Sequence, residues 1–233
     1  MGLHEGILAA AKPWPEVRAA LEKHCGALQD QGTIAPEQWL DPPQGEDAFH
    51  VASRDGRSYL LDPAMVLTTN PDLVVSLSGE LGCVVASAGA ETVSGTFWLV
   101  AAQEGRLLRL HWQMRASLTE ALDLGPKLPS ENTVPLEDVD GRGLFSALND
   151  LGFDPAMVTA PTAGQKFMWL AETLPATGDL QAQIKAHHDR FARRDGGDWT
   201  RHIKAVPRSG EGFDLQYQPP SAKPSLLKRL FGR

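Results

Sequence analysis

The 233-residue sequence has few cysteines and no long apolar run, and each shortage excludes a class of protein. Cys25 and Cys83 are too few for a disulfide framework and form no CxxC pair, so a reducing compartment is predicted. No apolar run is long enough to cross a bilayer. The first apolar stretch, residues 3–11, is too short and too acidic for a secretory signal. A cytoplasmic location is therefore predicted.

The motifs of several common chemistries are missing as well. The sequence has no P-loop, no G-x-G-x-x-G and no G-x-S-x-G, so neither a phosphate cradle nor a nucleophile elbow is predicted. His187 and His188 are adjacent, and neighbouring residues on a helix point in different directions, which disfavours a shared metal ion. A partial calcium-loop pattern begins at Asp138, but Asn149 stands where a bidentate Glu is expected. The sequence therefore predicts no metal and no cofactor, and it identifies no catalytic residue.

Charge is distributed unevenly along the chain. The sequence has 22 Lys and Arg against 29 Asp and Glu, which gives a formal net charge of -7. Residues 179–233 hold 11 of the basic and 6 of the acidic side chains, which leaves 11 basic and 23 acidic ones in residues 1–178. Such an acidic body disfavours nucleic acid and favours a basic protein as partner.

A β-meander is predicted at residues 81–113, and the rest of the chain is organised around it. The runs at 83–86, 96–102 and 107–112 are rich in β-branched and aromatic residues, as strands are. Gly105 supplies the tight turn between the last two runs. Apolar residues at both parities of the middle run predict a strand that is covered on both faces.

Three side chains of this region are candidates for contact with a partner. Alternation in the third run places Leu108, Leu110 and Trp112 on one side of the strand and Leu107, Arg109 and His111 on the other. The second side carries polar groups and is expected to face solvent or a partner. The Gly-containing connection at 87–95 is either a plain link or a binding loop with Glu91 as its charged contact. The candidates are therefore Glu91, Arg109 and His111.

Further helices and strands are predicted on both sides of the meander. Helices are expected at residues 3–11, 15–28, 36–40, 142–151, 165–174 and 179–194, and strands at 48–52, 57–61, 73–77, 199–206 and 212–218. Asp55-Gly56 is a strong hairpin signal between the first two of these strands. The predicted class is a soluble α+β protein whose central antiparallel meander sheet is flanked by N-terminal and C-terminal helices.

The chain is expected to have three parts. These are an N-terminal helical segment at 1–46, an α+β body containing the sheet at 47–217, and a flexible basic amphipathic tail at 218–233. In the tail, helical spacing puts four apolar residues on one face beside positive charge; the contact residues are Leu226, Leu227, Lys228, Arg229, Leu230 and Phe231. Such a tail suits an anionic membrane surface, a partner's groove, or packing back on the body.

Three functions stay open on the sequence alone. The leading one is non-catalytic binding of another protein by a protein of bacterial type, with a toxin-neutralising immunity protein as one concrete form. The second is a membrane-surface adaptor that uses the tail and is peripheral at the membrane. The third is an enzyme whose site is assembled from the distant residues Cys83, Glu91, Arg109 and His111. The sequence makes no prediction of the oligomeric state.

Overall fold

The computed structural model describes residues 4–35, 48–91, 94–114, 120–137, 141–154, 156–159, 164–169, 175–194, 203–207 and 213–217. The chain divides into two compact units, Met1–Ala186 and His187–Arg233. The second unit contains a hairpin of β10 (Ile203–Pro207) and β11 (Phe213–Tyr217), which confirms the hairpin predicted there. The boundary expected near residue 46 falls inside the first unit.

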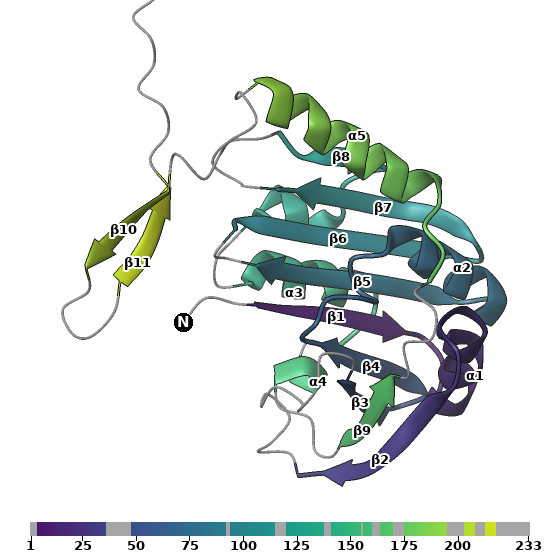
Figure 1. The fold of residues 1–233 in the computed structure, drawn as a ribbon. Coiled ribbons are helices and arrows are strands. Elements are labelled where there is room, and N and C mark those ends of the chain that lie inside the picture. The colour runs from purple at the N-terminus through teal and green to yellow at the C-terminus, as the bar shows by residue number, and fades with distance from the viewer. Residues whose placement is uncertain are drawn as a thin grey trace, which may run out of the picture. The chain divides into compact units, whose positions relative to one another are not determined.

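A nine-stranded sheet occupies the centre of the first unit (Figure 1). In chain order its strands are β1 (His4–Ala10), β2 (Leu28–Ile34), β3 (Ala48–Arg54), β4 (Arg57–Asp62), β5 (Val84–Glu91), β6 (Thr96–Gln103), β7 (Arg106–Gln113), β8 (Leu122–Leu124) and β9 (Gly164–Trp169). Across the sheet the order is β2-β9-β3-β4-β1-β5-β6-β7-β8, and every neighbouring pair is antiparallel. The predicted α+β class with a central antiparallel sheet is confirmed.

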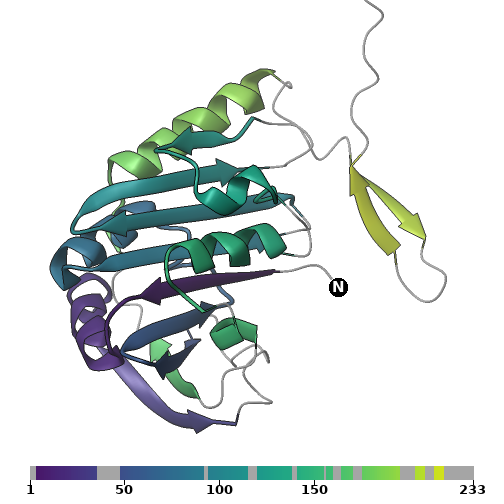
Figure 2. The same ribbon diagram turned by 180° about the vertical axis from the view of Figure 1, so that it is seen from behind.

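Helices cover both faces of this sheet, as the two opposite views show (Figures 1 and 2). One face carries α1 (Trp14–Cys25), α2 (Pro71–Leu81) and the start of α5 (Asp179–Arg194), and the apolar residues between them form the α2-side core. The other face carries α3 (Arg142–Asp150), α4 (Ala156–Thr159) and the short 3-10 helix η2 (Pro129–Asn132), with the α3-side core beneath. Burial on both faces explains why the sequence of β6 is a nearly continuous apolar run.

The N-terminal apolar run is a strand, and the helix predicted at residues 3–11 is wrong. β1 lies in the middle of the sheet, where Ile7 pairs with Leu61 of β4 and with Ala88 of β5. A central strand faces both cores, so its side chains show no polar alternation that would identify it from sequence. Gly6 also lets β1 approach the buried loop before α2, because a Cβ atom at this position would collide with the side chain of Thr68.

Two other segments have the opposite structure to the one predicted. The strand expected at 73–77 lies within α2, because Asn70 caps this helix by accepting the N–H of Leu73 at 3.0 Å and Gly82 ends it in the left-handed conformation. The helix expected at 165–174 is wrong where the chain is described, since β9 pairs there with both β2 and β3. Residues 170–174 lie outside the described part.

The remaining predictions for the first unit are largely confirmed. β3 and β4 form the predicted hairpin, with φ of 51° at Asp55 and 71° at Gly56, the signs that a two-residue hairpin turn needs. The helices α1, α3 and α5 and the three strands of the meander lie where they were expected. The connection at 87–95 is shorter than predicted, because β5 continues to Glu91. The turn at 36–40 and the tail at 218–233 lie outside the described residues. Within the described part, no helix is long and apolar enough to cross a membrane.

Trp98 joins the meander to the α2-side core. Its side chain is 1% exposed and stacks on Trp112 with ring centroids 5.8 Å apart. The indole N–H donates to Ser87 Oγ at 3.3 Å, and the Ser87 hydroxyl donates to the Thr68 carbonyl at 2.6 Å. A buried tryptophan with a satisfied N–H contributes both apolar area and a fixed orientation.

Truncation of this side chain tests its burial. We expect Trp98→Ala to lower the free energy of unfolding by about 3–5 kcal/mol, the range for removing a large buried aromatic side chain. Urea melts monitored by circular dichroism measure this change, with Glu104→Gln as a surface control expected to stay within about 0.5 kcal/mol. A loss below about 1 kcal/mol for Trp98→Ala would contradict the packing described for this residue.

Candidate functional site

A bulge in β7 determines which side chains meet on the α3 side of the sheet. Ala101 and Ala102 of β6 pair with Arg109 and Leu107, so Leu108 is an extra residue in β7. One inserted residue reverses the alternation before it. Leu107 consequently packs in the α2-side core and Leu108 in the α3-side core, which is the reverse of the prediction, while Arg109 remains on the α3 side.

Residues 120–137, the covering segment, close over this side of β7. β8, at the start of the segment, pairs with the outer edge of β7, and η2 follows it. Gly125 has a φ of 79°, and a Cβ atom there would collide with the carbonyl of Leu108. Gly143 of α3 makes an equally close approach to the carbonyl of Pro135. The two glycines therefore let the segment lie directly on its neighbours at both ends.

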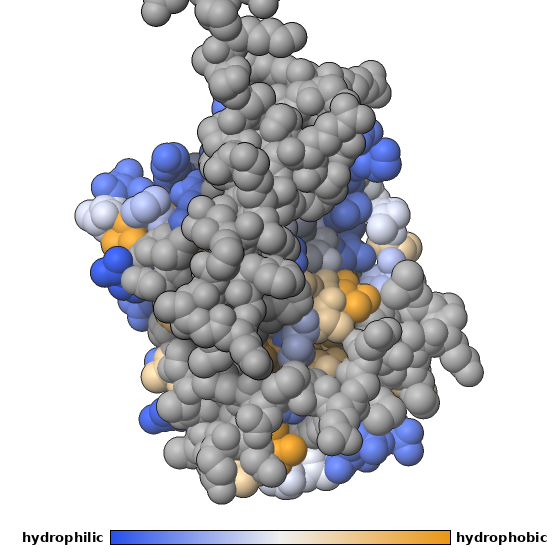
Figure 3. All heavy atoms as spheres, turned by 60° about the vertical axis from the view of Figure 1, so that its left-hand side comes forward, coloured by the Kyte–Doolittle hydropathy of each residue, from blue (hydrophilic) through white to orange (hydrophobic). Residues whose placement is uncertain are grey.

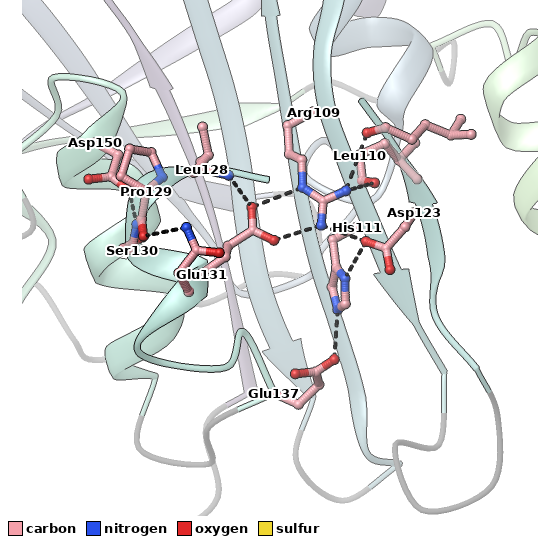
Figure 4. A network of polar contacts seen from close by, with 12 residues as sticks. Arg109, Leu110, His111, Asp123, Leu128, Pro129, Ser130, Glu131, Glu137 and Asp150 are labelled. Carbon is pink, nitrogen blue, oxygen red and sulfur yellow. Dashed lines mark hydrogen bonds and ion pairs between the residues drawn. The ribbon is translucent and has the colours of Figure 1, made fainter. Parts of the chain in front are cut away.

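Arg109 and His111 come together beneath this segment. Arg109 is 1% exposed and His111 is 5% exposed, so the expectation that this side of β7 faces solvent is wrong. Alternation along β7 does not reveal that residues 120–137 cover this side of the strand. Acidic side chains of the covering segment surround both cations (Figure 4).

Arg109 uses all five of its N–H donors inside the protein. Nε donates to Glu131 Oε1 at 2.9 Å, while Nη2 donates to Glu131 Oε2 at 2.6 Å and to Asp123 Oδ1 at 2.5 Å. Nη1 donates to the carbonyls of Leu110 and Leu124 at 3.0 and 3.3 Å. This pairing is bidentate and charge-assisted, the strong form of a carboxylate contact. Arg109 therefore fixes η2 and β8 to β7 and leaves no donor for a ligand.

His111 lies between two carboxylates. Its Nδ1 is 3.0 Å from Asp123 Oδ1, and its Nε2 is 3.1 Å from Glu137 Oε1 at an angle outside hydrogen-bond geometry. Burial lowers the pKa of His111, but the contacts with the carboxylates of Glu137 and Asp123 together outweigh burial, so the pKa lies above its ordinary value of 6.5. In its protonated form the imidazole has no lone pair left for accepting a proton or binding a metal ion.

The carboxylates show the reciprocal effect. The contact with His111 is the largest influence on Glu137 and lowers its pKa. Burial acts to raise the pKa of Asp123, but hydrogen bonds from His111 and Arg109 lower it overall. Burial likewise acts to raise the pKa of Glu131, but hydrogen bonds from Arg109 and from the Leu128 N–H lower it overall. All three carboxylates are therefore held in their charged form.

A cavity of about 350 Å³ opens beside this cluster. It is lined by Arg109, His111, Gln113, Glu120, Ala121, Asp123, Lys127, Glu131, Pro135, Leu136 and Glu137. The side chains of Asp123 and Glu137 are 45% and 29% exposed, whereas that of Glu131 is 4% exposed. Asp123 and Glu137 thus form a charged rim, and Arg109 and Glu131 form the buried base.

The other residues proposed from the sequence lie elsewhere. Glu91 pairs with Thr96, which points to the same face of the sheet as Trp98, so Glu91 lies on the opposite face from Arg109. Its carboxylate accepts a hydrogen bond from the Ser94 hydroxyl at 2.6 Å. Cys83 packs against the α2-side core, and burial raises the pKa of its thiol. The structure therefore brings together only Arg109 and His111 of the four residues suggested for an assembled enzyme site.

The three acidic partners were missed by sequence reasoning. Asp123, Glu131 and Glu137 lie in a Pro- and Gly-containing segment with no helical or strand period, so no pattern assigns them a direction. The available signal was indirect: a strand with Arg and His on one side, followed by an acid-rich segment. Among the described residues, no group of three or more His, Cys, Asp or Glu side chains is placed to hold a metal ion.

Comparisons of this chain with protein-family models, with curated proteins and with solved structures found no match. No relative therefore assigns a role to the cluster or to the cavity.

The buried ion pair makes a prediction about stability. We expect Arg109→Met and Glu131→Gln each to lower the free energy of unfolding by about 3–5 kcal/mol, because each leaves an uncompensated group in a buried site. The double variant should lose clearly less than the sum of the two, because it leaves neither charge unpaired. Denaturant melts of the four proteins provide the double-mutant cycle. Strict additivity would contradict a direct interaction between the two side chains.

His111 predicts a pH dependence with a definite sign. Its folded-state pKa lies above its unfolded value of about 6.5, so its contribution to stability is complete below that pH and is lost as pH rises through the folded pKa. We therefore expect the difference in unfolding free energy between the natural protein and His111→Gln to shrink as pH is raised above neutrality. Denaturant melts over a pH series measure this difference. A difference that grows with pH would contradict the assignment.

Proposed function

We propose that this chain is a non-catalytic protein that binds a basic protein partner, and that the rim of the cavity belongs to its binding surface. The observation that carries this proposal is the unequal exposure of the charges in the cluster. Arg109 uses all its donors internally, and the imidazole of His111 is 6% exposed. Asp123 and Glu137 remain 45% and 29% exposed, so the charge presented outward is negative.

The geometry of the cluster favours binding over the enzymatic alternative. A general base needs a free lone pair within reach of a substrate proton, whereas both nitrogens of His111 lie within 3.1 Å of carboxylates of the protein itself. A thiolate nucleophile needs a lowered pKa and a nearby base, whereas the pKa of Cys83 is raised and His111 is on the other face of the sheet.

The acidic composition of residues 1–178 also supports recognition by charge. In the view of Figure 3, hydrophilic residues predominate among the coloured ones, and the apolar ones form small separate groups. Residues 1–178 hold 23 acidic side chains against 11 basic ones. Complementary charge of this kind accelerates association with a basic partner. A toxin-neutralising immunity protein in the cytoplasm is one concrete form of this proposal.

Affinity purification of the full chain from its native host, followed by binding kinetics with the purified partner, tests the proposal. We expect the association rate to fall steeply as salt is raised, because screening weakens long-range steering. The dissociation rate should change much less. An association rate that is flat in salt would reject charge as the basis of recognition.

The sequence of the tail favours a second candidate, a peripheral adaptor at an anionic membrane. Residues 221–233 combine an apolar stripe with Lys228, Arg229 and Arg233, the composition of an interfacial helix. We expect the full chain to sediment with anionic but not with neutral vesicles, and a variant that ends at Gln218 to stay in solution. Full-length protein that remains in the supernatant with both lipids would exclude this candidate.

A further inference from the structure

The cavity beside β7 presents negatively charged hydrogen-bond acceptors to a ligand. Each donor of Arg109 is already used, as described above. Oδ1 of Asp123 contacts both Arg109 and His111, and Oδ2 has no partner among the described residues. Glu137 meets His111 through Oε1 and is partly exposed. A ligand that complements this rim must carry N–H donors and positive charge.

A second observation concerns His111, which lines the cavity. His111 Nε2 is fully buried and has no hydrogen-bond partner of acceptable geometry, although Glu137 Oε1 is 3.1 Å away. A buried polar atom without a hydrogen bond is costly, and it gains when a ligand supplies one. Because the neutral imidazole accepts a hydrogen bond at one of its nitrogens, Nε2 is able to accept from a donor that also bonds to the carboxylate of Glu137.

We propose that this cavity binds the ammonium or guanidinium group of a Lys or Arg side chain of a basic partner protein, with Asp123 and Glu137 as its carboxylate partners and His111 as an acceptor. This inference rests on the proposed function and names the contact through which the partner is recognised. The volume of about 350 Å³ suits it, because small-molecule sites begin at roughly 300 Å³ and one side chain is smaller than most small ligands.

Binding of the cation displaces a proton from His111. The imidazolium and the incoming cation occupy the same negative site, so the ligand favours the neutral imidazole, which keeps its Nδ1–H toward Asp123 and accepts at Nε2. The charged groups around this nitrogen are Arg109 on β7, Asp123 on β8, Glu131 on η2, Glu137 at the end of the covering segment, and Glu120 and Lys127 on the cavity wall. By linkage, affinity for the cation rises with pH.

A titration of the full-length protein with a capped Gly-Arg-Gly peptide tests the inference directly. The matched control is the same peptide with citrulline, which has nearly the shape of arginine without its charge. We expect the arginine peptide to shift the NMR signals of His111 with an affinity on the order of millimolar, because few of its atoms make contact. The citrulline peptide should not shift them. Calorimetry in two buffers of different ionisation enthalpy should show release of a proton.

Variants of the cavity wall should move the affinity in opposite directions. Glu137→Gln removes a negative rim group and should weaken binding of the arginine peptide about two- to fivefold, the effect of a partly exposed ion pair. Lys127→Gln removes a competing positive charge and should strengthen binding by a similar factor. Glu104→Gln, in the turn between β6 and β7, removes one negative charge outside the cavity lining and should change nothing.

Several results would overturn the inference. They are equal binding of the arginine and citrulline peptides, no change with Glu137→Gln, or weaker binding at higher pH. Binding of n-butylguanidine without binding of the peptide would assign the cavity to a small free guanidinium compound instead of a partner protein. If the peptide fails but the purified partner still associates in a salt-dependent way, the cavity inference is wrong and the proposed function stands. If association with the partner is flat in salt, the proposed function fails independently of the peptide.

Discussion

The buried charge of Arg109 is the constraint on which the α3 side of the first unit depends. A guanidinium that is 1% exposed is tolerated only when carboxylates and carbonyls satisfy it, and these come from the covering segment. That segment has little regular structure of its own, with a three-residue strand and a four-residue 3-10 helix. Its position is therefore set by ion pairs and by the close contacts of Gly125 and Gly143 rather than by a continuous hydrogen-bond ladder.

Asp123 connects this structural role with the site. Its Oδ1 accepts a hydrogen bond from Arg109 Nη2 at 2.5 Å and lies 3.0 Å from His111 Nδ1, so one carboxylate oxygen contacts both buried cationic side chains. A ligand that attracts Asp123 competes with the contact that holds β8 on β7. Networks of this kind couple their members, because the low local dielectric strengthens each interaction. The position of Asp123 therefore affects how firmly β8 is held on β7.

Sequence reasoning succeeded where the local signal agrees with the fold. The Asp55-Gly56 turn, the meander and the helices α1, α3 and α5, which have an apolar helical period, were all located in advance. It failed for β1, α2 and β9, because a short apolar run is compatible with helix or strand and distant pairing decides between them. Arg109 and His111 were identified as a pair, but their burial was not, because their acidic partners lie 12 to 26 residues later in an aperiodic segment.

The insertion of β9 between β2 and β3 has a consequence for synthesis of the chain. β3 meets β4 across a two-residue turn, whereas β2 pairs only with β9 among the described strands. A growing chain must therefore carry β2 unpaired until residues 164–169 have left the ribosome. Unpaired strands of nascent chains are hazardous because they can pair with one another. The five central residues of β2 in the sequence LQDQGTI are exposed and are polar or glycine, so the unpaired strand offers little apolar surface to another chain.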